Sequence, residues 1–248
     1  MDSNTFGFTV GRYACLALKG ADGFNCNVLL VTTDQHRVLV DTGTIGAPLL
    51  APLPLPERLR AAGIAPVDID VVILTHADFD HIGGAVDERG ERAFPRARYV
   101  LSRDEWAFWA TRPERLRPNL AYGEDFRRTG REVGVQRLAQ LRDTLELVDT
   151  GAEIVPGIRV QGAPGHTPGV LVVEVESGGE RLRFVADLVY NPADIADPDW
   201  FSIYDFDPPQ AVATRRRVLG QAAEDGALLM ATHAPFPGLG RVERDGPD

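Results

Sequence analysis

The sequence predicts an α/β fold in which layers of β-sheet form the core and helices cover the outside. Short apolar runs followed by a helix recur in both halves of the chain, and this alternation is typical of layered sheet-and-helix domains. Three such runs lie close together before residue 41, which favours an antiparallel layer over an immediate strand–helix–strand unit. The 248 residues fit one large domain, 1–248, that carries an insertion.

The N-terminal half is expected to hold most of one sheet and its covering helices. Gly63 ends a short helix, and the segment Ser102-Arg103-Asp104-Glu105 is a capping box, with Ser102 as N-cap and Glu105 reaching back to it. That helix opens a predicted helical insertion over residues 102–146. The expected strands cover residues 6–18, 24–33, 37–40, 71–75 and 97–101, and the short helix covers residues 57–62.

The C-terminal half returns to a strand pattern after the insertion. Asp207 is a favourable helix cap, and Pro208 stands in the first turn of the helix that follows, which Gly226 ends. The expected strands cover residues 153–155, 158–162, 170–176, 182–186 and 227–232, and the helix runs from residue 207 to about residue 224.

Composition narrows the kinds of partner. The formal net charge is −10 and the pI about 5.0, which argues against nucleic acid because phosphate binding needs a basic face. No apolar run is long enough for a membrane helix, and residues 1–11 show no signal-peptide pattern. We therefore expect a cytoplasmic protein with a small-molecule partner and no membrane partner, and a homodimer is one candidate oligomeric state. The two cysteines fit buried thiols.

One stretch carries the strongest chemical signal. The buried strand expected over residues 71–75 runs directly into four potential metal ligands, His76, Asp78, Asp80 and His81. Imidazole and carboxylate ligands suit Zn, Mn, Fe, Co or Ni. The irregular spacing fits a loop around an ion, with a helix beginning near Ile82 rather than one helix face.

Three later residues add to this signal, and two of them, Asp187 and His233, repeat the arrangement in which a strand delivers a ligand at its tip. His166 lies in a turn between two strands, Asp187 follows the strand over residues 182–186, and His233 ends the last strand. A lone histidine is usually a core or surface residue, and His36 is best explained in that way. Together the other residues predict a metal centre where several strands end.

These motifs resemble the metallo-β-lactamase-fold hydrolase superfamily, nearest its acyl-homoserine lactonase and methyl parathion hydrolase-like branches. The early Val38-Leu39-Val40-Asp41-Thr42-Gly43 also matches that pattern. The resemblance implies a four-layer αβ/βα sandwich that holds two divalent metal ions, with Zn first and Mn or Fe as alternatives. It implies a first site of His76, Asp78 and His166, a second of Asp80, His81 and His233, a bridging Asp187, and a supporting carboxylate, Asp41, that orients the ligands.

Asp78 departs from the family pattern, which has histidine at that position. With three aspartates, two divalent ions and a hydroxide, the cluster is neutral, whereas histidine would leave one positive charge. A neutral cluster should attract anionic substrates less, and an oxygen-richer site leans toward Mn or Fe. The alternative is that Asp78 does not bind and the first site is weak or empty.

The resemblance implies a hydrolase that uses a metal-bridging hydroxide to cleave a neutral ester, with a lactone as the leading candidate. Cysteine stands at the position of Asp187 in two-zinc β-lactamases of this fold, so the aspartate indicates the broader hydrolase branches. Asp80 and Tyr190 are the expected catalytic residues, the tyrosine polarising the carbonyl; ordinary packing is the alternative for Tyr190. An apolar pocket is expected from Trp106, Trp109, Phe201, Tyr204 and Phe236.

Other activities stay open at this level. A phosphotriesterase or aryl esterase of the same fold, or a thiol-ester hydrolase, would use the same kind of centre. A non-catalytic metal-binding module is the alternative from a different class, and it would carry a degenerate site.

Overall fold

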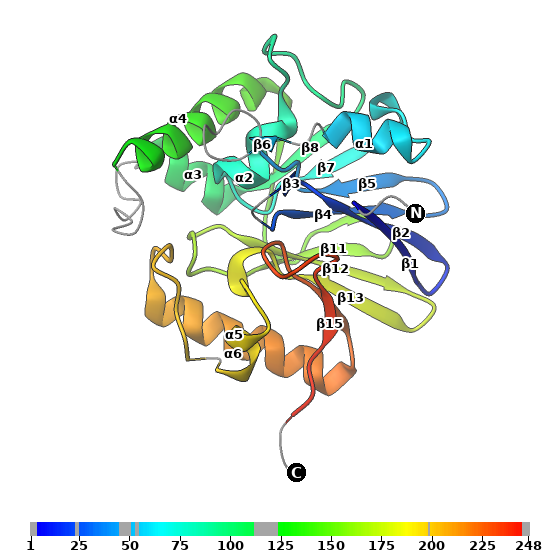
Figure 1. Cartoon of the computed structure of the whole chain (residues 1–248), viewed down its shortest axis with the longest axis vertical. Coiled ribbons are helices and arrows are strands. Elements are labelled where there is room, and N and C mark those ends of the chain that lie inside the picture. Colours follow the sequence, from blue (N-terminus) through cyan, green and yellow to red (C-terminus); the bar gives the residue numbers. More distant parts are fainter. Residues whose placement is uncertain are drawn as a thin grey trace.

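Two β-sheets face each other, and helices cover both outer faces (Figure 1). The computed structural model describes residues 4–22, 25–44, 51–52, 55–111, 124–197 and 199–244. Helices α1 to α4 lie outside the first sheet and helices α5 and α6 outside the second. The four-layer αβ/βα sandwich is therefore confirmed.

The first sheet has seven strands in the order β1-β2-β4-β5-β7-β8-β9. Its strands are antiparallel from β1 to β5 and parallel from β5 to β9. The early hairpin layer was thus correctly predicted. The bounds are β1 Thr5–Val10, β2 Tyr13–Lys19, β4 Asn27–Thr32, β5 Arg37–Val40, β7 Val71–Ile73, β8 Arg98–Ser102 and β9 Leu145–Val148, with the small pair β3 Ala21–Asp22 and β6 Ala51–Pro52 beside them.

The second sheet has six strands in sequence order, β10 to β15. All its pairs are antiparallel except β13 and β14. That parallel pair places the ends of two strands distant in sequence side by side. The bounds are β10 Glu153–Val155, β11 Ile158–Gly162, β12 Leu171–Ser177, β13 Glu180–Phe184, β14 Leu228–Met230 and β15 Leu239–Arg241.

The helices differ in length and in how they begin. Asp207 caps the longest helix of the second outer layer, since its Oδ1 accepts from the Gln210 amide at 3.1 Å, and Gly226 ends that helix at φ 64°, as predicted. The bounds are α1 Leu55–Ala61, α2 Phe79–Ile82, α3 Arg103–Thr111, α4 Glu124–Leu141, α5 Ala193–Ala196 and α6 Pro208–Asp225. Helices α3 and α4 fall within the predicted insertion, whose residues 112–123 lie outside the described part of the chain. Among the described residues, no helix combines the length and the apolar character needed to cross a membrane.

Alternating side chains of the central strands fill two separate cores. Val38 and Val40 of β5 face the other sheet, whereas Leu39 faces the outer helices. Strand β7 repeats the pattern, with Val71 and Ile73 between the sheets and Val72 outside. Parallel strands covered on both faces need apolar residues throughout, which explains the unbroken apolar run before the metal-ligand motif.

Leu39→Ala is expected to destabilise the protein by about 2–5 kcal/mol, because Leu39 is fully buried between β4 and β7 and truncation leaves a cavity. Urea unfolding followed by circular dichroism measures the loss. Val67→Ala is the control, because Val67 is 42% exposed and such substitutions stay within about 0.5 kcal/mol. Equal stability of the two variants would contradict this account of the outer core.

Three local predictions were wrong. Residues 6–18 form two strands, because the chain reverses at Gly11, which has φ 54°. The helix expected near Ile82 begins at Phe79 instead. The capping box is only half formed: the Glu105 amide donates to Ser102 Oγ at 3.0 Å, but the Glu105 carboxylate bonds elsewhere in the fold.

Candidate metal centre

The predicted ligands converge because strands end at a common edge. His76, Asp187 and His233 each stand three residues after a strand, namely β7 ending at Ile73, β13 ending at Phe184 and β14 ending at Met230. His166 lies in the connection from β11 to β12. The carboxyl ends of neighbouring strands are where layered α/β proteins place their sites.

His76, Asp78 and His166 form what we name the first ligand group. Asp78 Oδ2 lies 3.1 Å from His166 Nε2 and 3.7 Å from His76 Nε2. His76 and His166 are buried, whereas the Asp78 side chain is 28% exposed. The structure therefore brings the Asp78 carboxylate within 3.7 Å of both histidines of this group.

Asp80, His81 and His233 form the second ligand group. Asp80 Oδ2 lies 3.6 Å from His233 Nε2 and 3.9 Å from His81 Nε2. Both histidines and Asp80 are buried. Helix α2 supplies Asp80 and His81 from a single turn.

Asp187 lies between the two groups. Its Oδ1 is 2.9 Å from His81 Nε2. Its Oδ2 is 3.1 Å from His233 Nε2 and 3.4 Å from His166 Nε2. This position fits the bridging role that the sequence predicted, because one carboxylate reaches ligands of both groups.

Buried polar atoms without hydrogen-bond partners test whether the residues fit a metal. Within the described ranges, His76 Nε2, His81 Nε2 and Asp187 Oδ1 make no hydrogen bond; the last two face each other at 2.9 Å without hydrogen-bond geometry. These three residues also form a possible ligand set. Leaving buried polar atoms unsatisfied is costly. The donor set of imidazole nitrogen and carboxylate oxygen suits a divalent cation, so the residues fit the ions that the resemblance implies.

Each histidine faces the cluster with Nε2, and a contact at its second ring nitrogen, Nδ1, orients the ring. His81 Nδ1 lies 2.7 Å from Asp41 Oδ2, and His233 Nδ1 donates to the Asn25 carbonyl at 2.7 Å. His166 Nδ1 lies 3.3 Å from Asp205 Oδ1, a contact that the sequence analysis missed. Such contacts fix the ring so that Nε2 points toward an ion.

The charges of the cluster also favour a cation. Burial raises the pKa of the Asp187 carboxyl, but the imidazoles of His233, His81 and His166 outweigh burial and hold that pKa well below its usual range. Burial lowers the pKa of His81, but the carboxylates of Asp187, Asp41 and Asp80 raise it well above its ordinary value. The Asp187 carboxylate therefore stays ionised and draws positive charge into the cluster.

Tyr190 lies against the cluster. Its hydroxyl is 3.1 Å from Asp187 Oδ2 and 3.2 Å from His166 Nδ1. Its ring stacks on the His233 ring at 5.0 Å and on the Tyr204 ring at 6.0 Å. Burial and the charge of Asp187 raise the pKa of Tyr190 well above its ordinary value, so the phenol remains a hydrogen-bond donor.

The predicted pocket residues separate into two sets. Trp109 is buried in the outer core, where Trp106 also packs, and Phe236 packs against the core between the sheets. Phe201 and Tyr204 are exposed instead. Two neighbours that the sequence analysis did not identify, Trp200 and Ile203, are also exposed, and the Trp200 ring lies 5.9 Å from that of Tyr190. Trp200 and Tyr204, whose rings lie 5.9 and 6.0 Å from that of Tyr190, thus bring exposed apolar surface next to the cluster.

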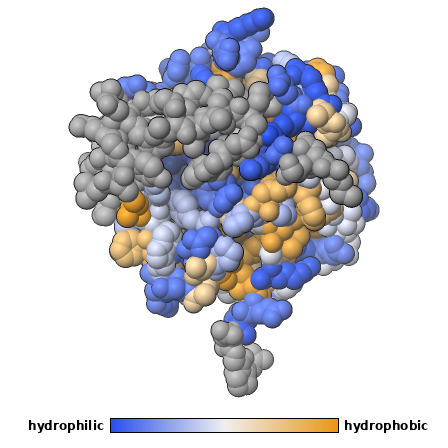
Figure 2. Space-filling model, viewed as in Figure 1, coloured by the Kyte–Doolittle hydropathy of each residue, from blue (hydrophilic) through white to orange (hydrophobic). Residues whose placement is uncertain are grey.

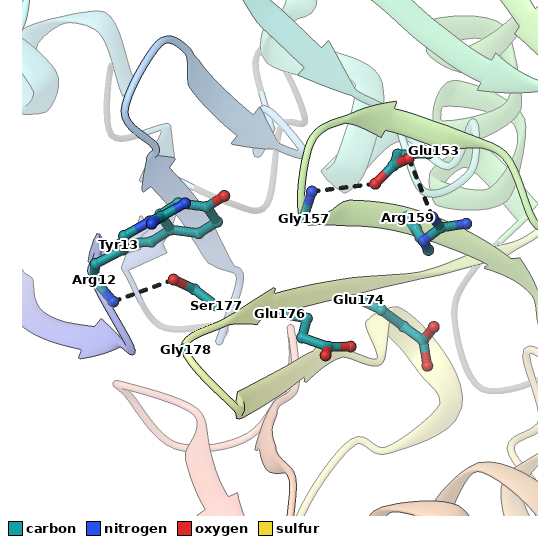
Figure 3. A pocket seen from close by; sticks show the side chains of 9 residues that line it. All are labelled: Arg12, Tyr13, Glu153, Gly157, Arg159, Glu174, Glu176, Ser177 and Gly178. Atoms are coloured by element: carbon teal, nitrogen blue, oxygen red, sulfur yellow. Dashed lines mark hydrogen bonds and ion pairs between the residues drawn. The ribbon is translucent and has the colours of Figure 1, made fainter.

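A separate hollow lies at the opposite end of the second sheet (Figure 3). The turn between β1 and β2, the turn before β11 and the turn after β12 line it, whereas the ligand segments follow β11 and β13. Its charges are paired, as in the 3.1 Å contact of Arg159 with Glu153. In Figure 2, hydrophobic side chains form a surface patch over the strands of the second sheet. Neither feature brings ligand residues together.

Sequence comparison finds hydrolases among the proteins that this chain resembles. A probable metallo-hydrolase of Mycobacterium tuberculosis is 29% identical over 190 residues, which are 67% of this chain and 57% of that protein; the chain thus matches little more than half of that relative's length. An N-acyl homoserine lactonase of Bacillus thuringiensis is 23% identical, over 82% of this chain and 79% of the relative.

Two solved structures share nearly the whole fold. The dizinc quorum-quenching lactonase AidC has a TM-score of 0.88 and 28% identity, covering 98% of this chain and 95% of its own. The hydrolase AbOPH has a TM-score of 0.86 and 25% identity, covering 100% and 96%. The model of the metallo-beta-lactamase superfamily matches residues 21–233. The chain belongs to the metallo-beta-lactamase superfamily.

Proposed function

We propose that this protein is a dinuclear metal hydrolase that opens a neutral ester, with a lactone as the leading substrate class. One observation carries the proposal: Asp187 lies within 3.4 Å of imidazoles from both ligand groups, and the Tyr190 hydroxyl lies 3.1 Å from that same carboxylate. A hydrolytic centre needs both a place for the ions and a donor beside them.

The residues have distinct roles in this proposal. His76, Asp78 and His166 would hold one ion, Asp80, His81 and His233 the other, and Asp187 both. Bound divalent ions supply Lewis-acid polarisation of an ester carbonyl and lower the pKa of a coordinated water. Asp80 would also accept a proton inside the cluster, because its Oδ2 lies 3.9 Å from His81 Nε2 and 3.6 Å from His233 Nε2.

Tyr190 would donate a hydrogen bond to the carbonyl oxygen as negative charge develops on it. The phenol stays protonated in this environment, and a donor that strengthens its bond in the transition state accelerates the reaction. Stacking on His233 and Tyr204 holds the ring in place. Packing and catalysis are therefore compatible roles for this residue.

Substrate charge and shape support a lactone. Three aspartates would neutralise the cluster and remove its attraction for anions. The exposed apolar segment over residues 200–204 offers a surface for an acyl chain. The relatives from Bacillus are N-acyl homoserine lactonases, and AidC was solved with a product, a hexanoyl homoserine.

Metal analysis combined with a substrate panel tests the proposal. We expect close to two divalent ions per chain, and faster turnover of N-acyl homoserine lactones than of phosphotriesters, aryl esters or thiol esters. If a metal-loaded preparation leaves lactones intact but cleaves phosphotriesters, the lactonase assignment is wrong. Near-zero metal after reconstitution would instead support a non-catalytic module.

Tyr190→Phe is expected to lower kcat about 10²–10³-fold while metal content and KM change little, because the variant loses only the donor to the developing oxyanion. Steady-state kinetics with elemental analysis measures both quantities. Tyr13→Phe is a matched control, since the Tyr13 hydroxyl donates to the Pro156 carbonyl next to the distant hollow. Equal kcat in the two variants would mean that Tyr190 contributes packing and no hydrogen bond to the reaction.

A further inference from the structure

Glu105 is a buried carboxylate that belongs to neither ligand group. It stands in the first turn of α3 and has no exposed surface. Its carboxylate accepts four hydrogen bonds, from the Ala77 amide at 3.0 Å, Trp109 Nε1 at 2.7 Å, Thr167 Oγ1 at 2.6 Å and the Gly169 amide at 3.2 Å. Among the described residues this carboxylate contacts donors but no cation, and a buried carboxylate is costly when its hydrogen bonds are lost.

Three of the four donors lie on the segments that carry the first ligand group. Ala77 stands between His76 and Asp78, and Thr167 directly follows His166. Gly169 ends the same turn as His166. One carboxylate therefore joins the two chain segments that deliver all three ligands of the first group, although it touches none of their ligand atoms.

The contact between these segments is close and specific. Ser102 Oγ donates to the Gly169 carbonyl at 2.7 Å and accepts from the Glu105 amide at 3.0 Å. A Cβ at Gly169 would lie 2.0 Å from the Glu105 amide nitrogen, so only glycine permits this approach. The start of α3 is thus held against the turn that carries His166.

The second ligand group has a carboxylate of its own. Asp41 accepts from the Thr75 amide at 2.8 Å and from Thr75 Oγ1 at 2.9 Å, and it lies 2.7 Å from His81 Nδ1. Asp41 thus supports a ligand of the second group directly, and it reaches His76 of the first group only through Thr75 Oγ1, which lies 3.0 Å from His76 Nδ1. Glu105 supports the first group through backbone and hydroxyl donors.

We propose that Glu105 is a positioning residue that sets the affinity of the first ligand group, while Asp41 does so for the second. The inference rests on the two-ion function proposed above. Because all four partners of Glu105 are donors, glutamine at this position could accept through one oxygen only, and its NH2 group would face other donors. Loss of a supporting contact commonly weakens metal binding about 10–100-fold.

Stepwise zinc affinities of Glu105→Gln and Asp41→Asn test this assignment. Chelator competition should show one of the two ions weakened about 10–100-fold in each variant. Anomalous diffraction from zinc-loaded crystals should locate the loss at His76, Asp78 and His166 in Glu105→Gln. In Asp41→Asn the larger loss should lie at the second group, because Asp41 contacts His81 directly; asparagine tolerates the φ of 63° found at position 41.

Smaller changes keep the test valid if Glu105→Gln does not fold. Thr167→Val removes one donor and should weaken the same ion by a smaller factor, and Thr167→Ser should restore wild-type affinity. Asp104→Asn, an exposed neighbour in the same turn, should leave both affinities unchanged.

The outcomes separate this inference from the function it rests on. Suppose that the wild type binds two ions, and that Glu105→Gln and Thr167→Val leave both affinities unchanged or weaken both equally. That result would overturn the role of Glu105 but not the two-ion proposal. A wild-type chain with no ion in the first group would overturn both this role and the two-ion proposal.

Discussion

Asp187→Ala should abolish metal binding and turnover together. Asp187 is the residue whose carboxylate reaches His81, His166 and His233, and it also accepts from the Tyr190 hydroxyl. Its removal would leave these imidazoles without the carboxylate that lies between them. We expect fewer than one ion per chain and a fall in kcat/KM of about three orders of magnitude or more, because the Lewis acid itself is lost.

Elemental analysis and kinetics on the same preparation check this result. Asp199→Ala is the matched control. Asp199 is an exposed carboxylate 12 residues further along the chain, where it pairs with Arg216, and it belongs to neither ligand group. Circular dichroism of both variants shows whether the fold is retained. A folded Asp187→Ala protein that keeps two ions and its activity would rule out the bridging role.

The positions of the candidate ligands could be predicted because the signal is local. Each of His76, Asp187 and His233 follows an apolar strand closely in sequence. Strand ends meet at one edge of a layered fold, so residues far apart in the chain are expected to lie together in one site. Asp41, which follows β5 directly, was predicted from the family resemblance instead.

The supporting residues could not be predicted in this way. Asp205 lies 39 residues from His166, and Glu105 lies 62 residues from Thr167. The local pattern at Glu105 even pointed elsewhere, since a capping box predicts that its carboxylate returns to Ser102. In the fold, donors from three other positions and from Trp109 occupy that carboxylate, so tertiary contacts override the local preference.

Aromatic residues were the least predictable part of the site. Trp109 is apolar enough to line a pocket, but helix α3 turns it toward the outer core, where its Nε1 donates to Glu105. Trp200 carried no motif, yet it lies beside Tyr190. Composition alone cannot distinguish these cases, because an aromatic side chain serves a core and a pocket equally well.

Asp78→Ala should empty the first ligand group while the second keeps its ion. Asp78 Oδ2 is 3.1 Å from His166 Nε2, and its side chain does not cap α2, the helix that begins after it. Removing the Asp78 carboxylate should therefore leave helix α2 intact. Zinc binding should fall from two ions to one, and calorimetric titration with competition measures the change.

Asp78→His separates ligand binding from charge. The 28% exposure of the Asp78 side chain leaves room on the solvent side for a larger imidazole. If Asp78 binds an ion, histidine should restore the second equivalent that Asp78→Ala loses, and it should shift preference from Mn toward Zn because nitrogen replaces oxygen. The cluster would gain one positive charge, so turnover of an anionic ester should rise relative to a neutral lactone. Full metal content in Asp78→Ala would contradict this argument, since a residue that binds no ion cannot set the charge of the cluster.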